Sequence, residues 1–198
     1  MPNLPRVTSV LEYFGVIDKR WYNTEACSRG RYVHQACGYI ALGKEIPRDW
    51  WERHPEVWEY VHAFSKGLAL LSARPLGVEV PVTLCAERVI GHADIALTAP
   101  GIGVVPLELK SGGDCPWVGL QTAAYAIGFG TVHRYTMQLR PNGKPKMVRL
   151  DRYQDFDEFR TYARALWALR NRGVIDDAGW QQLCRSEQAA IEDRDGSN

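Results

Sequence analysis

The sequence lacks any long apolar run, which excludes a membrane-spanning helix. Crossing a bilayer takes about 18 or more consecutive apolar residues, and none of the 198 residues belongs to such a stretch. The opening residues, MPNLPRVTSV, also lack the apolar core of a signal peptide. We therefore expect a cytoplasmic protein that has no membrane partner.

Cysteine is also scarce, and neither charge is in clear excess. The five cysteines (27, 37, 85, 115 and 184) are odd in number and show no CxxC spacing. This usage is typical of free thiols in a reducing compartment and offers no zinc or iron–sulfur motif. Lysine and arginine total 24 against 23 acidic residues, a formal net charge of +1. Any contact with nucleic acid must therefore come from a local patch.

The residues that are present indicate one α/β domain. The chain is long enough to bury a sizeable core, and 45% of it is hydrophobic. Helical spacing predicts helices over residues 24–43, 54–73, 116–130 and 153–173. Valine-rich alternation predicts strands over 76–85, 87–98, 103–111, 132–140 and 145–150.

The order of these elements predicts a central mixed β-sheet flanked by helices. The short turn APGIG and the Asn-Gly pair at 142–143 each predict an antiparallel hairpin. We expect a single domain over residues 1–186 and a polar, flexible C-terminal tail over 187–198.

Three charged residues lie where strand interiors should be apolar: Asp94, Glu108 and Lys110. Glu108 and Lys110 are two apart and share one face of a strand, while Asp94 lies on the neighbouring strand about 4.8 Å away. Carboxylate oxygens are the ligands that Mg²⁺ prefers, and a nearby lysine can hold a water or balance charge. The alternative is a solvated strand face with a cross-strand ion pair.

The helix that follows these strands carries Gln121 and Tyr125 four residues apart, on one helix face. Because this helix begins soon after Lys110, it must pack back onto the same sheet. Its two polar side chains can then reach the edge of the charged cluster. The alternative places Tyr125 in the core and Gln121 on the surface.

Gly30, His34 and Gly38 recur every fourth residue, so they share one face of the first long helix. On that face the imidazole of His34 lies between two glycines, which have no side chain. Close packing there would let His34 reach inward as a metal ligand. The alternative is a core or surface histidine without that role. Arg29 and Arg31 precede His34 near the helix start, where the helix N-terminus favours the binding of a phosphate.

Two further groups could serve the same chemistry. Glu79 takes the opposite face of its strand from its valine neighbours, so it is either another metal ligand or acceptor, or an exposed edge glutamate. The basic segment 140–152 includes Lys144 and Lys146. It could track a DNA backbone or be a solvated turn.

Taken in order, His34, Glu79, GHAD (91–94), ELK (108–110) and QTAAY (121–125) resemble the motifs of the PD-(D/E)XK nucleases. The pattern is most similar to the RecB-like branch, including compact phage-type exonucleases. The resemblance covers roughly residues 7–130. It implies a restriction-endonuclease-like core and phosphodiester hydrolysis that depends on Mg²⁺ or Mn²⁺.

The resemblance also implies a role for each matching residue. Asp94 and Glu108 would bind the metal, together with His34 and the carbonyl group of Leu109. Lys110 would orient or activate the attacking water, while Gln121 and Tyr125 would brace the site or touch the DNA backbone. Branch members that carry an iron–sulfur cluster have three cysteines near the C-terminus. Only Cys184 lies there in this sequence, which disfavours that subclass.

These observations favour a metal-dependent DNA nuclease, and among nucleases an exonuclease in recombination or end processing. About 200 residues leave little room for a separate recognition domain. The alternatives are a structure- or sequence-specific endonuclease on the same core and a non-catalytic DNA-binding module. DNA is the expected partner, with a recombinase or single-strand-binding protein as a further candidate.

Overall fold

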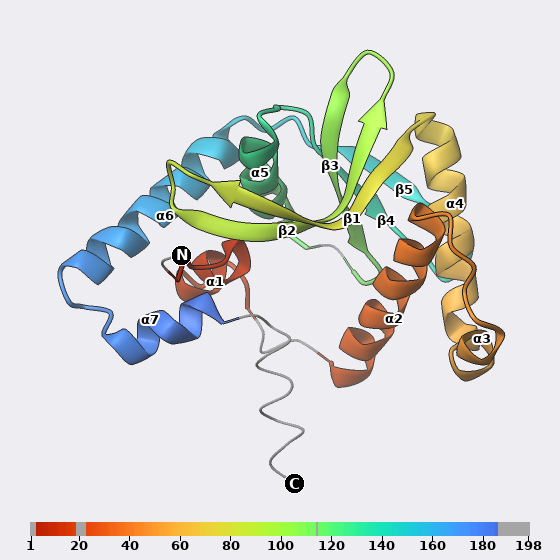
Figure 1. The fold of residues 1–198 in the computed structure, drawn as a ribbon, viewed down its shortest axis with the longest axis horizontal. Coiled ribbons are helices and arrows are strands. Elements are labelled where there is room, and N and C mark those ends of the chain that lie inside the picture. The colour runs from red at the N-terminus through yellow and green to blue at the C-terminus, as the bar shows by residue number, and fades with distance from the viewer. Residues whose placement is uncertain (1–2, 19–22, 114, 186–198) are drawn as a thin grey trace, which may run out of the picture.

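The computed structural model describes residues 3–18, 23–113 and 115–185. The tail expected over residues 187–198 lies outside the described residues. Figure 1 shows the elements in order. The first half contains α1 (Val7–Tyr13), α2 (Thr24–Ala41), α3 (Arg48–Arg53), the 3₁₀ turn η2 (Pro55–Val57), α4 (Trp58–Leu71), β1 (Arg74–Leu84) and β2 (Val89–Ala99). The second half contains β3 (Gly103–Lys110), α5 (Val118–Phe129), β4 (Tyr135–Gln138), β5 (Lys146–Arg149), α6 (Gln154–Asn171) and α7 (Asp177–Cys184).

The five strands form one mixed sheet in the order β1-β2-β3-β4-β5. Both predicted hairpins, β2–β3 and β4–β5, are antiparallel, and β1 is antiparallel to β2. β3 and β4 are parallel, so a crossover must join them, and α5 supplies it.

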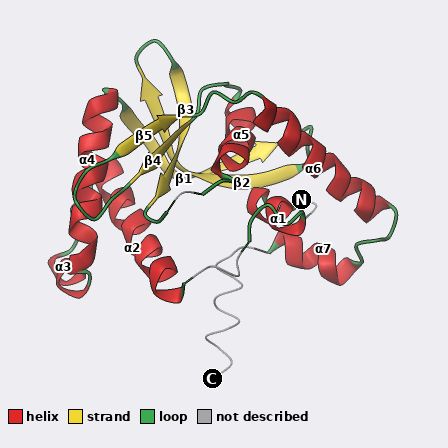
Figure 2. Cartoon of the chain, turned by 180° about the vertical axis from the view of Figure 1, so that it is seen from behind, coloured by secondary structure: helices red, strands yellow, loops and turns green. Residues whose placement is uncertain are grey.

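Helices cover the sheet on both sides and enclose two large hydrophobic cores and a small third cluster among the described residues. Figure 1 shows α2, α3 and α4 on one side of the molecule and α1, α6 and α7 on the other. Seen from behind, α5 packs beside α6 (Figure 2). The core under α2 and α4 includes the buried side chains of Phe64, Leu107 and Met137. The other core includes Leu11 and Phe159. This arrangement confirms the predicted α/β fold.

Three short helices, α1, α3 and α7, were missed by the sequence analysis, and one helix is shorter than predicted. α1 buries Val7, Val10 and Leu11, and this i, i+3, i+4 spacing is the signal that could have revealed it. α3 is only six residues long. The helix predicted over 54–73 begins at Trp58, because Pro55 opens a separate 3₁₀ turn. None of the described helices combines the length and apolar character needed to span a membrane.

The fully buried side chain of Arg134 links α5, α6 and the segment that follows β5. The guanidinium of Arg134 donates to the carbonyl oxygens of Gly119 (2.5 Å), Leu150 (3.2 Å) and Arg152 (2.6 Å). It also forms an ion pair with Asp155 at 2.9 Å. A Cβ atom at Gly119 would lie 2.6 Å from Oδ2 of Asp155, so a glycine is needed at this contact. The clamp fixes the first turn of α5 against the start of α6.

We predict that Arg134→Ala lowers the free energy of unfolding by about 3–5 kcal/mol, because the Asp155 carboxylate stays buried with a lost partner. Denaturant unfolding monitored by circular dichroism measures this change. Arg48→Ala is the control, since Arg48 pairs with Glu52 in an exposed i, i+4 ion pair. Equal effects of the two substitutions would contradict a structural role for the clamp.

Candidate active site

The charged cluster lies where β2 and β3 separate. The pairing of these strands runs from Ala99–Gly103 to Ile95–Leu107, which leaves Asp94 and Glu108 at the opening between them. The backbone N–H of Leu109 donates to Oδ2 of Asp94 at 2.7 Å. Asp94 therefore bonds across the opening to the strand that carries Glu108 and Lys110.

His34 reaches this opening from α2, as the glycine-lined helix face predicts. A Cβ atom at Gly38 would lie 3.2 Å from Val78 on β1, and one at Gly30 would lie 3.5 Å from Ser111. The helix therefore approaches the sheet closely at Gly38 and is in ordinary contact with the segment after β3 at Gly30. Between them, Nδ1 of His34 lies 3.4 Å from Oδ1 of Asp94.

Glu79 joins the cluster from β1 with an unusual backbone. The pairs Val78–Ile95 and Val80–Ala93 place Glu79 opposite Asp94. Its φ of 48° lies in the left-handed region, where a residue other than glycine is uncommon and costs free energy. Single ligand atoms of His34, Glu79 and Asp94 all lie within 4.8 Å of one another. Although Glu79 is exposed, it thus lies beside the metal-ligand candidates.

The predicted pair on α5 extends the cluster inward through hydrogen bonds. Nζ of Lys110 donates to Oε1 of Glu108 at 2.8 Å and to Oε1 of Gln121 at 3.2 Å. Nε2 of Gln121 in turn donates to the hydroxyl of Tyr125 at 3.1 Å. A Cβ atom at Gly91 would lie 2.8 Å from the Tyr125 ring, which explains the glycine that opens GHAD. Gln121 and Tyr125 are both buried.

The second carboxylate oxygen of Glu108 is buried and has no hydrogen-bond partner among the described residues. An ionised carboxylate in this position is costly unless a cation contacts it. The charge of Asp94 acts on Glu108, and the carboxylate of Glu79 and the imidazole of His34 lie beside Asp94. Such oxygen-rich sites suit Mg²⁺ or Mn²⁺, and the imidazole also accommodates Mn²⁺. The residues present therefore fit a divalent cation.

The pKa values of Asp94 and His34 move apart because the two groups form an ion pair. Burial alone would raise the pKa of Asp94, but the charge and hydrogen bond of His34 outweigh burial and lower it. For His34, burial alone would lower the pKa. The attraction of Asp94 and their hydrogen bond overcome this and raise it to about 9. Without a metal, a protonated His34 supplies positive charge at Asp94.

Glu108 and Lys110 both bind protons more tightly than usual. Burial and the nearby charge of Asp94 raise the pKa of Glu108 to about 7, despite the ion pair with Lys110. Burial would lower the pKa of Lys110, but the charges of Glu108 and Asp94 raise it. Lys110 therefore stays an ammonium at neutral pH, while Glu108 exchanges its proton near neutrality.

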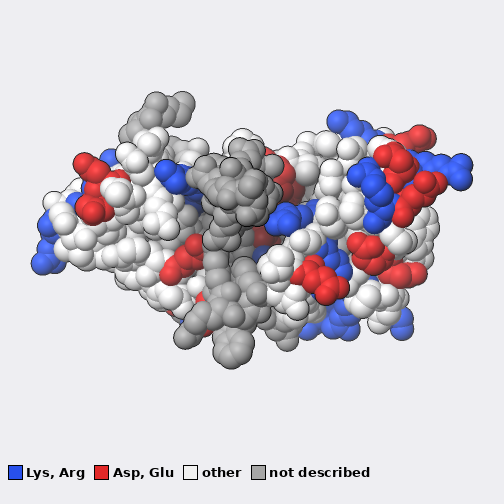
Figure 3. Space-filling view, turned by 90° about the horizontal axis from the view of Figure 1, so that it is seen from below, with Lys and Arg blue, Asp and Glu red and all other residues white. Residues whose placement is uncertain are grey.

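The predicted DNA-contacting residues occupy different surroundings. Arg31 is exposed and bonds to Ser28, whereas Nε of Arg29 is buried without a partner among the described residues. Lys144 is exposed on a turn that folds back onto α4, where Nζ of Lys66 donates to the carbonyl oxygen of Gly143. Acidic and basic side chains are interspersed on the face shown in Figure 3, in keeping with the net charge.

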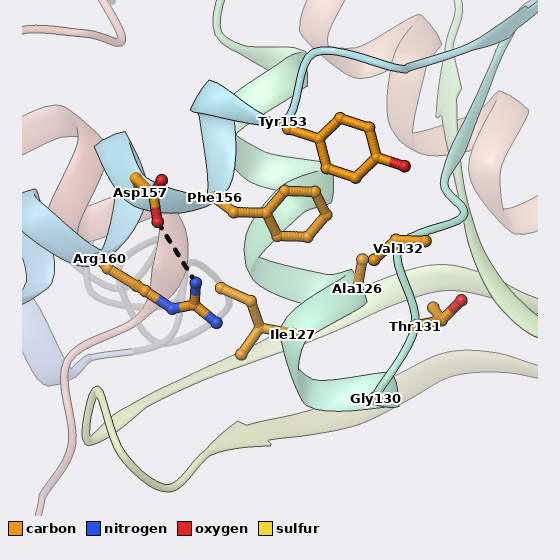
Figure 4. A pocket seen from close by; sticks show the side chains of 9 residues that line it. All are labelled: Ala126, Ile127, Gly130, Thr131, Val132, Tyr153, Phe156, Asp157 and Arg160. Carbon is orange, nitrogen blue, oxygen red and sulfur yellow. Dashed lines mark ion pairs between the residues drawn. The ribbon is translucent and has the colours of Figure 1, made fainter.

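Two cavities lie near the helix α5. One, of about 360 Å³, lies between the end of α5 and the start of α6 (Figure 4). Its described lining includes none of the clustered residues, and its arginine, Arg160, is already paired with Glu87 and Asp157. The other cavity, of about 330 Å³, is lined in part by Lys110. The charged cluster therefore adjoins the second cavity through Lys110.

Comparison with known proteins identifies the fold. No family model matches the sequence, and no curated protein matches it. The structure is similar to that of LHK-Exo in complex with dAMP, with a TM-score of 0.51 and 14% sequence identity over 96% of this chain and 94% of that chain. The crystal structure of SSO0001 matches at a TM-score of 0.38 and 13% identity over 82% of each chain. The fold is an α/β, restriction-endonuclease-like core.

The pKa shifts predict that the metal-free protein loses stability as pH rises. His34 has a folded pKa of about 9 against 6.5, so its contribution is complete below about 6.5 and is lost as pH rises through about 9. Glu108 has a folded pKa of about 7 against 4.5, so its contribution is lost between these values. We expect the free energy of unfolding, measured in chelator, to fall between about pH 5 and 9.

Adding Mn²⁺ should stabilise the protein more at pH 8 than at pH 6, because the cation displaces these protons. His34→Asn is the matched variant, since it removes the upper part of the slope and keeps the part due to Glu108. A metal-induced stabilisation that is independent of pH would contradict the assignment of these groups to the metal site.

Proposed function

We propose that the protein is a metal-dependent deoxyribonuclease that hydrolyses phosphodiester bonds. The observation that carries this proposal is a buried carboxylate oxygen of Glu108 that has no hydrogen-bond partner among the described residues, while its other oxygen pairs with Lys110 and the charge of Asp94 acts on it. A site of two or three carboxylates with one ammonium suits a cation and a phosphate together. The likeness in fold to an exonuclease, LHK-Exo, supports the same reading.

The roles of the residues follow from their positions. Asp94, Glu108 and His34 would hold the cation, with Glu79 and the carbonyl group of Leu109 as further ligands. When bound, the cation would neutralise charge at the phosphate and would lower the pKa of a water molecule at the site. Lys110 lies within 2.8 Å of Glu108, so its ammonium can hold the attacking water beside the metal-binding carboxylate.

Gln121 and Tyr125 are assigned to bracing rather than to DNA contact. Their side chains are 7% and 3% exposed, so a DNA backbone has little access to them. Gln121 accepts a hydrogen bond from Lys110, and Tyr125 holds the amide of Gln121 in place. This relay restricts the direction in which the ammonium of Lys110 points.

Among nucleases, the proposal favours an exonuclease that acts in recombination or DNA end processing. The structural match spans 96% of this chain and 94% of LHK-Exo. The competing possibilities are an endonuclease and a DNA-binding module. The narrower association with phage systems, and with a recombinase or single-strand-binding partner, rests on the sequence motifs and stays a prediction.

We predict that Asp94→Asn or Glu108→Gln lowers the cleavage rate at least about a hundredfold, because each removes one negative charge at the metal site. End-labelled linear DNA and circular DNA are incubated with Mg²⁺, Mn²⁺ or chelator. Digestion of linear DNA alone identifies an exonuclease, and cutting of circles identifies an endonuclease. Glu87→Gln is the control, since Glu87 is a buried carboxylate that pairs with Arg160 away from the cluster. Full activity of either site variant would refute the site.

Lys110→Ala separates chemistry from binding. If Lys110 positions water, single-turnover cleavage slows by about a hundredfold or more, while DNA affinity in Ca²⁺ changes little. Lys144→Ala should do the reverse, because an exposed phosphate contact contributes affinity and about one unit of salt dependence. Weak binding by Lys110→Ala with a normal rate at saturation would instead make Lys110 a phosphate-binding residue.

A further inference from the structure

A cleft beside Lys110 has no role in the chemistry described so far. It measures about 330 Å³ and lies between the start of α5 and the strands β4 and β5. Thr136 and Val148 form part of its lining from the sheet, and Pro116 and Val118 line it from the α5 side. Lys110 and Lys146 also line it.

The register of the sheet sets the direction of this cleft. Lys110 on β3 pairs with Gln138 on β4, which pairs with Lys146 on β5. Directly paired residues project from the same face, so the two lysines share one row and stand two strands, about 10 Å, apart. In the next row, Glu108, Thr136 and Val148 are aligned in the same way. The cleft therefore runs from the reactive pair, Glu108 and Lys110, toward the edge strand.

The lining favours an anion that has an apolar body. Its described residues include two lysines and no acidic side chain. Lys146 is exposed, whereas the ammonium of Lys110 is already paired with Glu108. Between the lysines, the side chains of Pro116, Val118 and Val148 are apolar. Ligand cavities hold roughly 300–1,000 Å³, so this cleft suits one small ligand.

We propose that this cleft binds one nucleotide of the substrate strand, next to the phosphodiester that faces Glu108 and Lys110. The sugar and base would lie along the apolar lining, and a phosphate of that nucleotide would contact Lys146. This inference rests on the proposed nuclease function and adds to it a binding residue, Lys146, on the edge strand. It also separates Lys146, which lines the cleft, from Lys144 on the turn.

The first test is equilibrium binding of deoxyadenosine 5′-monophosphate in Ca²⁺, with deoxyadenosine and inorganic phosphate as separate probes. Lys146→Ala should weaken mononucleotide binding about tenfold, the scale of one hydrogen bond to a charged group, and leave deoxyadenosine binding unchanged. Val148→Trp fills the cleft and should weaken the mononucleotide and the nucleoside but not inorganic phosphate. Lys44→Ala, which removes an exposed lysine outside the lining, should change none of them.

A second measurement uses the unsubstituted protein. Cys115 lines the cleft, whereas Cys85 is exposed and lies outside the lining. Saturating mononucleotide should therefore slow alkylation of Cys115, measured by mass spectrometry of peptides, and leave alkylation of Cys85 unchanged. This readout does not depend on cleavage or on the folding of any variant.

The outcomes distinguish this inference from the proposed function. If the protein cleaves DNA but Lys146→Ala and Val148→Trp bind the mononucleotide as the parent does, the cleft assignment is wrong and the nuclease stands. If no metal supports cleavage, the nuclease fails, and the mononucleotide titration still decides the cleft. Absence of mononucleotide binding at millimolar concentration, or equal protection of both cysteines, overturns the inference.

Discussion

Negative charge at the point where β2 and β3 separate is the constraint on which the rest of the site depends. Asp94 lies beside Glu79 and His34, and its charge also acts on the buried carboxylate of Glu108, which is costly without a cation or a donor. The surrounding groups answer this need in part: protonated His34 faces Asp94, and Lys110 faces Glu108. One oxygen of Glu108 is left without a described partner, so the compensation is incomplete.

The groups that compensate or orient this charge come from the helix α2 (His34), the strand β3 (Lys110) and the helix α5 (Gln121 and Tyr125). Close approach of the two helices to the sheet brings their side chains in. The small side of α2 at Gly38 lets His34 reach Asp94, and the glycine at 91 admits the ring of Tyr125. The first turn of α5 is held from behind by Arg134 through Gly119. The orientation of Lys110 thus depends on contacts that extend well beyond the cluster. A substitution at any of these close contacts would therefore displace a charged group of the cluster in addition to reducing core packing.

Local patterns in the sequence predicted most of the fold and several contacts of the candidate site. The two-residue spacing of Glu108 and Lys110 and the four-residue spacing of Gln121 and Tyr125 each fix a shared face, and the structure shows those pairs in contact. Arg134 could not be predicted in this way, because its partners are three carbonyl groups and a carboxylate scattered between Gly119 and Asp155. The left-handed backbone of Glu79 could not be predicted either, because the usual sequence signal for that conformation is a glycine and this position is a glutamate. The cleft beside Lys146 depends on the register of three strands, which follows from tertiary packing.

The backbone conformation of Glu79 sets local strain against the placement of a carboxylate in the cluster. A left-handed conformation favours glycine, and a glycine there would remove both the strain and a charge that opposes Asp94. Glu79 therefore holds a carboxylate opposite Asp94 at a local cost in backbone free energy that a glycine at the same position would not carry.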